Sequence, residues 1–207
     1  MAGTDYLDLV DWRRRVGDLY RLTGPDALAE FRRGRDDLFR THPQSPIEDR
    51  EGFAGLDYFP GDPEYRVNAV FEPSADPSEL AIDTGGEDGA IRYRRAGLLR
   101  FTLDGTECSL LVLSLIAYAG GLFLPFKDAT SRNETYGGGR YLFDTVKNTD
   151  GLALEAVVGS PRVVIDFNYA YNPSCAYSPR WACPLAPPEN TLPIPIRAGE
   201  RNFPHRL

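Results

Sequence analysis

Charged and polar residues gather in the segment at 126–141, which reads FKDATSRNETYGGGRY. Lys127 and Asp128 follow an apolar stretch, and Arg140 comes directly after three glycines. A glycine-rich loop exposes backbone N–H groups, and a nearby lysine and arginine add positive charge, so the segment is suited to hold a phosphate or carboxylate. It lacks a Walker pattern and a following helix. The alternative is a hairpin loop in which Arg140 pairs with an acid such as Asp128 or Asp166.

A second polar run, DFNYAYNPSCAYSPRWACPLAPPEN, spans residues 166–190 and is called the strap below. Asn168 and Asn172 are typical of turns, because their side chains bond to neighbouring backbone groups. If one face of this run packs on the protein, the other presents Asp166 and Asn168 to a pocket. For each of these residues taken alone, a structural role is more common than a functional one. Buried clusters of Asp, Asn, Tyr and Arg nevertheless often mark sites, since they are costly unless every group is satisfied.

Two of the three cysteines, Cys175 and Cys183, lie in the strap and allow three interpretations. A disulfide between them would close a loop of about nine residues and stabilise the fold by roughly 2–3 kcal/mol. A reducing cytosol disfavours that bond. Inert, half-buried thiols are the second and commonest case. A reactive thiolate next to Arg180 or Arg140 is the third, with Cys175 as the catalytic candidate.

Other catalytic and metal sites have little support in the sequence. The only histidines, His42 and His205, lie in loop or terminal contexts, so neither Cys–His catalysis nor a four-ligand zinc site is predicted. Asp128, Asp166 and Glu189 are candidates for acid–base chemistry, but nothing places any two of them at the ~5–10 Å that glycosidases need. No nucleophile-elbow motif is present. The identity of any cofactor is left open.

Charge and hydropathy limit the classes of partner. The chain of 207 residues carries 30 acids against 23 lysines and arginines, a net charge of −7. Such a protein lacks the basic face that nucleic acids and anionic membranes require. No apolar run reaches the ~18 residues of a spanning helix, and the first residues show no signal-peptide pattern. We therefore expect a cytoplasmic, single-domain protein that binds neither nucleic acid nor membrane.

The N-terminal part has helical spacing. Residues 5–22 and 26–39 predict two helices, separated by Gly24-Pro25, and the sequence SPIE at 45–48 predicts a short third helix with a capping box. The run Arg13–Arg15 is a candidate anion site, although interspersed acids favour a solvated helix face. We expect residues 1–50 to pack on the main domain, and their helices to provide the contact surface of a candidate homodimer.

From Tyr65 the apolar residues alternate with polar ones, in seven segments separated by turn signals. Asp104-Gly105 is the clearest hairpin turn, because a type I′ turn needs positive φ at both central residues. Strands without helices between them cannot form parallel units, so residues 51–207 predict a mainly β domain, an antiparallel barrel or sandwich. After Asp166 repeated prolines exclude a regular sheet, and the aromatic residues argue against disorder. We therefore expect an ordered, proline-rich strap that closes one end or edge of the sheet.

Several of these segments together resemble a known family. PFKDATSRNETYGGGRYL, DFNYAYNPSCAY and CPLAPPENTLPIPIRAGE are similar to the prokaryotic family catalogued as domain of unknown function 1684, as is the upstream SPIEDREGFAGLDYFPGDPEYRV. The resemblance covers most of the chain and implies a β-rich single domain of a prokaryotic protein. It implies no activity, but it raises the expectation that these motifs form a common site. The matching positions are Lys127, Asp128, Tyr136, Gly139, Arg140, Tyr141, Asp166, Asn168, Tyr171, Asn172, Cys175, Cys183, Glu189 and Asn190.

The leading hypothesis is that a small polar or anionic molecule binds between the loop at 126–141 and the strap. Lys127 and Arg140 would meet its charge. A hydrolase or transferase that uses Asp166 or Cys175 at the same place is the first alternative, and a structural or protein-interaction module is the second. The predicted ligand-binding residues are Lys127, Asp128, Tyr136, Arg140, Tyr141, Asp166, Asn168, Tyr171 and Asn172.

Overall fold

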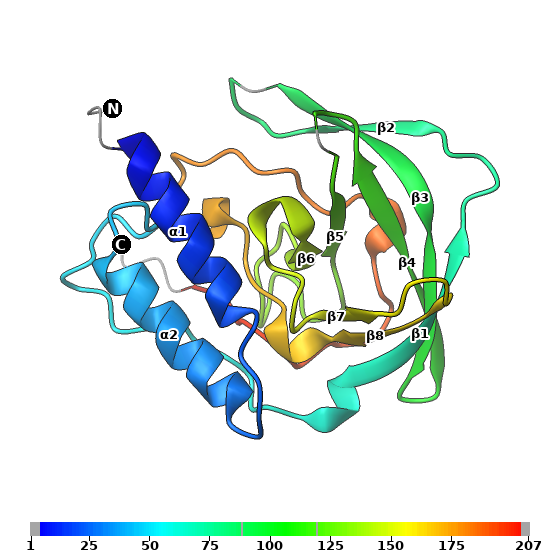
Figure 1. Cartoon of the computed structure of the whole chain (residues 1–207), viewed down its shortest axis with the longest axis horizontal. Helices are drawn as coiled ribbons and strands as arrows, with labels where there is room; N and C mark the ends of the chain where they lie inside the picture. Colours follow the sequence, from blue (N-terminus) through cyan, green and yellow to red (C-terminus); the bar gives the residue numbers. More distant parts are fainter. Residues whose placement is uncertain (1–4, 88, 119, 204–207) are drawn as a thin grey trace.

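Near Tyr65 the spacing of apolar residues changes from a helical to an alternating pattern, and in the structure two helices precede this point and a sheet follows it. The computed structural model describes residues 5–87, 89–118 and 120–203. Helices α1 (Asp5–Leu19) and α2 (Ala27–Thr41) lie next to each other on one side of a strongly curved sheet (Figure 1). The predicted class, mainly β with N-terminal helices, is confirmed.

Aromatic side chains hold the two helices to the rest of the molecule. The rings of Tyr20, just after α1, and Phe31 of α2 meet edge to face with centroids 4.8 Å apart. Phe31 meets Tyr169 of the strap in the same way at 5.0 Å. Such pairs contribute about 0.5–1.5 kcal/mol beyond the burial of their area. All three rings are buried, so the helices share one hydrophobic core with the strap and sheet.

The third helix predicted at residues 45–48 does not form. The Ser45 hydroxyl accepts a hydrogen bond from the Ile47 backbone N–H at 3.1 Å, two residues along the chain. Serine makes such local turns as well as helix caps. The Glu48 carboxylate accepts a hydrogen bond from the Ser178 hydroxyl of the strap. This tertiary contact occupies the glutamate that would have completed the capping box.

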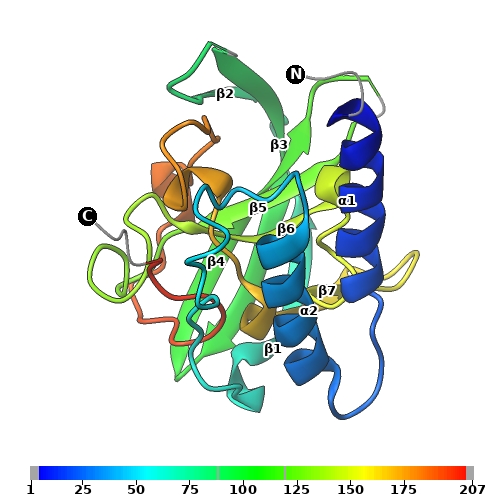
Figure 2. The ribbon, with the colours of Figure 1, turned by 90° about the vertical axis from the view of Figure 1, so that its left-hand side faces the viewer.

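In the described residues, eight strands form one antiparallel sheet that curls into a nearly closed barrel (Figures 1 and 2). Their spatial order follows the chain from β6 back to β3 and then passes to β1, β8 and β7, while β2 pairs with one end of β3. The bounds are β1 Arg66–Pro73, β2 Glu79–Asp83, β3 Ala90–Leu103, β4 Thr106–Leu115, β5 Leu122–Phe126, β6 Arg140–Asp144, β7 Leu154–Ala156 and β8 Arg162–Asp166.

The Asp104-Gly105 turn joins β3 to β4, as the sequence predicts. Both residues have positive φ, 49° and 69°, which is the combination that a type I′ turn requires. The ladder then continues along both strands, with one irregularity beside Gly97. This long hairpin supplies the middle of the sheet.

The strap is ordered and completes the sheet at the free edge of β6. The backbones of Tyr141 and Tyr171 exchange two hydrogen bonds, of 2.8 and 3.0 Å. Further along, the Lys127 N–H donates to the Asn190 carbonyl at 2.8 Å. Covering an edge prevents it from pairing with another chain. The strap is therefore a structural part of the barrel.

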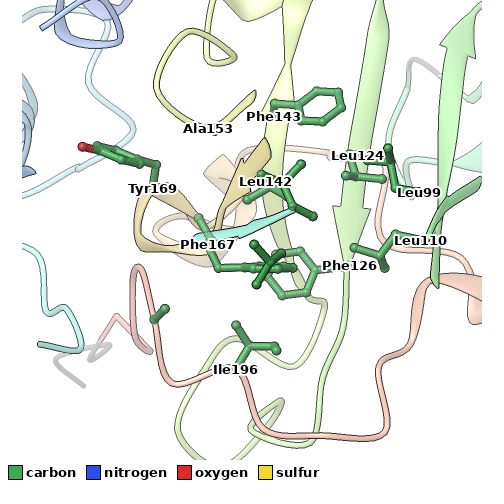
Figure 3. Packing of buried hydrophobic residues seen from close by; sticks show 14 of the residues in the cluster. Leu99, Leu110, Leu124, Phe126, Leu142, Phe143, Ala153, Phe167, Tyr169 and Ile196 are labelled. Carbon is green, nitrogen blue, oxygen red and sulfur yellow. The ribbon is translucent and has the colours of Figure 1, made fainter. Parts of the chain in front are cut away.

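Apolar side chains fill the interior of the barrel (Figure 3). The rings of Phe126 and Phe167, both fully buried, pack edge to face with centroids 5.2 Å apart. Four strands contribute leucines to the same cluster, namely Leu99, Leu110, Leu124 and Leu142. Small barrels are usually filled in this way. The interior of the barrel is thus a packed hydrophobic core.

Candidate functional site

A cavity of about 200 Å³ lies between the two helices and the strap. Its walls come from α1, α2, the strap and the short 3-10 turn η2 (Thr145–Lys147) that follows β6. Three of the predicted ligand-binding residues, Tyr141, Tyr171 and Asn172, belong to this wall. The aromatic residues that line it are Trp12, Phe39, Tyr141, Tyr171, Tyr177 and Trp181.

The cavity wall is positively charged. Arg13 of α1, Arg35 of α2 and Lys147 of η2 line it, and no carboxylate is among the described residues that do so. The whole chain carries a net charge of −7, so this surface departs from the general trend. Arg13 forms no ion pair with any carboxylate of the described residues. A cleft lined by one sign of charge concentrates ions of the opposite sign.

A buried network holds Arg35 in place at the cavity wall. Its Nη2 donates to Oε2 of Glu200 at 3.0 Å and to the Tyr177 hydroxyl at 3.1 Å. The Glu200 carboxylate also accepts hydrogen bonds from the Tyr177 hydroxyl and the Asn172 backbone N–H. Burial opposes the charge of Arg35, but Glu200 and the nearby tyrosines outweigh this effect and raise the pKa of Arg35. The guanidinium is therefore charged and fixed before any ligand arrives.

Two buried polar atoms of cavity-lining residues have no hydrogen-bond partner among the described residues. They are Nε of Arg35 and Oδ1 of Asn172. Asn172 is 2% exposed, and its Nδ2 already donates to the Arg201 carbonyl at 2.7 Å. A buried polar group without a partner costs about 1–3 kcal/mol, and native proteins usually supply a partner, often water. One donor and one acceptor thus remain unpaired in the described residues beside the cavity.

Local structure places Lys147 on the cavity wall. The Asp144 carboxylate accepts a hydrogen bond from the Val146 N–H at 3.0 Å, which starts η2, and Asn148 ends it with φ 57°. Lys147 Nζ is 3.5 Å from Oδ2 of Asp144 and 5.3 Å from the centroid of the Tyr141 ring. Its side chain is 36% exposed. The ammonium is thus anchored loosely and is accessible to a ligand.

The predicted residues Asp128 and Arg140 form a buried ion pair with each other. Nη2 of Arg140 donates to Oδ2 of Asp128 at 2.9 Å, and the two side chains are 0% and 1% exposed. Arg140 also donates to the carbonyls of Ile196, Ala198 and Glu200. It therefore fastens residues 196–200 to β6, and neither member of the pair belongs to the cavity wall. This pairing is the alternative that the sequence left open.

Asp166 and Asn168 meet at a different junction, where the end of β8 contacts Asp62. Oδ1 of Asp166 accepts hydrogen bonds from the backbone N–H and Nδ2 of Asn168, at 2.9 and 2.8 Å. The Asn168 side chain also makes two bonds, of 2.8 and 3.0 Å, with the Asp62 backbone. Burial raises the pKa of Asp166, against the effect of the bonds from Asn168. These residues shape the turn after β8 and are not part of the cavity wall.

The two cysteines of the strap lie next to each other. The Cys175 backbone N–H donates to Sγ of Cys183 at 3.4 Å, and the Tyr136 hydroxyl donates to Sγ of Cys175 at 3.6 Å. All three cysteines of the chain are free. Cys183 belongs to the cavity wall, whereas Cys175, Tyr136 and Lys127 do not. Tyr136 is thus connected to the cavity wall indirectly, by its hydrogen bond to Cys175, which contacts Cys183.

Arg13 is a residue whose role the sequence only partly indicates. It begins the run Arg13–Arg15, for which a solvated helix face is the favoured interpretation. That interpretation describes Arg15, whose Nε pairs with Oδ2 of Asp11 at 2.6 Å on the exposed side of α1. Arg13, half-buried, turns to the cavity. A run of like residues on a helix divides between two faces, and only the neighbouring elements decide which member is functional.

Arg35 and Lys147 lie outside the predicted binding set. Lys147 follows a strand and belongs to no motif. Arg35, however, lies four residues after Phe31 and three before Leu38, on the apolar stripe of the second helix. An arginine on a buried face needs a partner, because an unpaired buried charge is strongly unfavourable. The position of Arg35 on this apolar stripe therefore indicates, from the sequence, that it has a buried partner or a ligand.

The described residues contain no group of three or more His, Cys, Asp or Glu side chains that could hold a metal ion. Nε2 of His42 is hydrogen-bonded to Oδ2 of Asp11 at 3.2 Å, and His205 lies outside the described residues. None of the helices described here has the length and apolar character needed to cross a membrane.

Comparison with known proteins places the chain in a family. Residues 51–201 match the model described as "Protein of unknown function (DUF1684)". The chain belongs to this DUF1684 family. The matched residues include the loop at 126–141 and the strap, whereas α1 and α2 precede them, so the cavity is built from both parts.

A solved structure is similar over nearly the whole chain. It is the solution NMR structure of the uncharacterized protein from gene locus rrnAC0354 of Haloarcula marismortui. The two chains are 34% identical with a TM-score of 0.62, and the similarity covers 94% of this chain and 96% of the other. The search of curated proteins returned no match. The resemblance to the family is confirmed.

Proposed function

We propose that the protein binds a small anionic molecule in the cavity between α1, α2 and the strap. One observation carries this proposal. Three cations and no carboxylate line the cavity among the described residues, in a protein whose net charge is −7. Two of these cations have a carboxylate partner outside the wall, Glu200 for Arg35 and Asp144 for Lys147. Arg13 faces the cavity without such a counter-charge.

The size of the cavity and its polar atoms narrow the class of ligand. Sites for drug-sized ligands usually measure about 300–1,000 Å³, so a volume of about 200 Å³ fits a smaller molecule. Oδ1 of Asn172 needs a donor, and Nε of Arg35 needs an acceptor. A molecule that carries one anionic group and one hydroxyl or amino group meets both needs. Small hydroxy acids, amino acids and phosphate esters are of this kind.

This proposal keeps the predicted ligand class and part of the predicted residue set. Tyr141, Tyr171 and Asn172 stay in the wall of the site. The charge of the ligand is met by Arg13, Lys147 and Arg35, in the roles that were predicted for Lys127 and Arg140. Preorganised charges make a good anion site because little free energy is lost in arranging them when the ligand binds.

Replacing Lys147 with glutamine is expected to weaken the binding of small anions about fivefold. A half-exposed ion pair is worth up to about 1 kcal/mol, which corresponds to this factor. Binding can be measured by calorimetric titration, after a thermal-shift screen with phosphate, sulfate, lactate and glycerol phosphate, with glycerol as the neutral comparison. The same loss is expected for Arg13→Gln. Both effects should shrink as salt is added.

The chain offers a matched control for each variant. Lys127 is the only other lysine and lies outside the cavity wall, and Arg14 is the exposed neighbour of Arg13. Lys127→Gln and Arg14→Gln should leave the affinity unchanged within a factor of two. Equal losses for Lys127→Gln and Lys147→Gln would point to a general effect of net charge. Equal stabilisation by glycerol and by the anions would also contradict the proposal.

The other expectations from the sequence stay predictions. A hydrolase or transferase that uses Asp166 or Cys175 is tested by replacing each residue in a substrate screen. A homodimer through the helices is compatible with the exposure of Tyr6, Leu7 and Val10 on α1, which is 66%, 71% and 45%. Sedimentation that yields the mass of a single chain at micromolar concentration would exclude that dimer.

A further inference from the structure

The cysteine pair at the cavity has the contacts of a reactive dithiol. Sγ of Cys183 accepts a hydrogen bond from the Cys175 backbone N–H at 3.4 Å, although the two residues are eight positions apart in the chain. The Tyr136 hydroxyl donates to Sγ of Cys175 at 3.6 Å. The Cys183 sulfur therefore lies against the Cys175 residue, and Cys183 lines the wall of the cavity.

The surroundings of the pair favour a thiolate on Cys183. The neighbouring Cys175 thiol, the backbone N–H groups and the nearby Lys147 ammonium stabilise the anion, and they lower the pKa of Cys183 to about 6 despite burial. The shared hydrogen bond and burial raise the pKa of Cys175. The other ionisable groups that face the pair are the hydroxyls of Tyr136 and Tyr141, whose pKa values burial raises, so both stay neutral.

We propose that Cys183 and Cys175 form a peroxide-sensitive dithiol, in which Cys183 is oxidised first and Cys175 completes a disulfide. This site goes beyond the proposed anion binding and does not depend on it. The pair differs from an isolated cysteine because the residue whose backbone N–H contacts the reacting sulfur carries a second thiol. Redox-sensing cysteines commonly have this arrangement, with a low pKa, access to small molecules and a second thiol nearby.

The reaction balances with hydrogen peroxide as the only oxidant. The Cys183 thiolate attacks one peroxide oxygen, the S–O bond forms as the O–O bond breaks, and hydroxide leaves and takes up a proton. Sulfur is oxidised by two electrons to a sulfenic acid while peroxide is reduced. The Cys175 sulfur then attacks the Cys183 sulfur, so that the S–S bond forms and the S–O bond breaks. The thiol proton of Cys175 leaves with the oxygen as a second molecule of water.

Cys108 provides an internal reference within the same chain. It lies on β4, is 6% exposed and belongs to the barrel core. Burial raises the pKa of the Cys108 thiol. Cys183 is also 6% exposed. A difference in reactivity between the two thiols would therefore reflect the cavity and the neighbouring groups of Cys183 rather than its exposed fraction.

The test treats the reduced full-length protein with equimolar hydrogen peroxide at pH 7, then alkylates the remaining thiols and maps them by mass spectrometry. The wild type is expected to lose two thiols, to gain a Cys175–Cys183 cross-link and to keep Cys108 alkylated. Cys175→Ser should stop at a dimedone-reactive sulfenic acid on Cys183. Cys183→Ser should slow the oxidation of Cys175 at least tenfold, and Cys108→Ser should leave the cross-link unaffected.

A second measurement needs no variant. The rate of iodoacetamide labelling of the wild type, mapped by residue, should rise with a midpoint near pH 6 for Cys183 and at a distinctly higher pH for Cys108, whose pKa burial raises. A common midpoint above pH 8 would overturn the proposal. So would sulfenic acid trapped first on Cys175, or peroxide oxidation of Cys108 at the same rate as that of Cys183.

Discussion

Replacing Arg140 with methionine is expected to lower the free energy of unfolding by about 3–5 kcal/mol, the usual cost of breaking a buried ion pair from one side. Asp128 would remain in the interior without its counter-charge, with a side chain only 1% exposed. Three carbonyl groups, of Ile196, Ala198 and Glu200, would lose a charged donor. Domains are stable by only about 5–15 kcal/mol, so this variant would be close to unfolding. Urea denaturation followed by circular dichroism measures the change.

Two further variants distinguish the effect of breaking the buried ion pair from the effect of removing a positive charge. Arg92 of β3 forms an exposed ion pair with Glu79 of β2, so Arg92→Met should cost less than about 1 kcal/mol. Arg140→Lys keeps the charge but lacks the planar fork that serves one carboxylate and three carbonyls, so it should fall between the two methionine variants. An Arg140→Met protein as stable as the Arg92→Met protein would show that residues 196–200 are held by other contacts.

The parts of the fold that local sequence determines could be predicted. The alternation after Tyr65 and the Asp104-Gly105 turn depend only on neighbouring residues, and both match the structure. The SPIE segment shows the limit of local reasoning. Ser45 and Glu48 satisfy the rule for a capping box, yet Glu48 bonds to Ser178, 130 residues away. A partner at that distance in the chain leaves no trace in the local pattern.

In the candidate site, too, one part could be predicted from local sequence and the other could not. The strap is rich in aromatic and amide residues, which is why Tyr171 and Asn172 could be selected from sequence. The cationic side of the cavity could not be, because Arg35 is fixed by Glu200, 165 residues along the chain. Arg140 was the more conspicuous cation beside its three glycines, but its side chain is buried and its two Nη atoms bond to Asp128 and to backbone carbonyls. Sequence identifies groups able to bind an anion, whereas burial and partners decide which of them remain available.

Replacing Asn190 with alanine is expected to lower the free energy of unfolding by about 3 kcal/mol, because its side chain takes the place of missing strand pairing. β4 and β5 pair at only two positions and then diverge. The Asn190 amide enters the gap, accepting from the Leu111 N–H at 2.7 Å and donating to the carbonyls of Leu111 and Pro125 at 2.9 and 2.7 Å. Alanine would leave three buried backbone groups unpaired, each costing about 1–3 kcal/mol before any water enters.

A variant of similar shape tests whether hydrogen bonds or packing cause the loss. Asn190→Leu fills the space but pairs with none of the three backbone groups, so it should be as unstable as Asn190→Ala. Asn133→Ala, at an exposed position, should stay within about 0.5 kcal/mol of the wild type. Hydrogen exchange adds a local readout, because the Leu111 amide should lose protection in both Asn190 variants. If Asn190→Leu restored the stability, the residue would act by filling space, and the strap would be held to β4 and β5 by packing rather than by this amide.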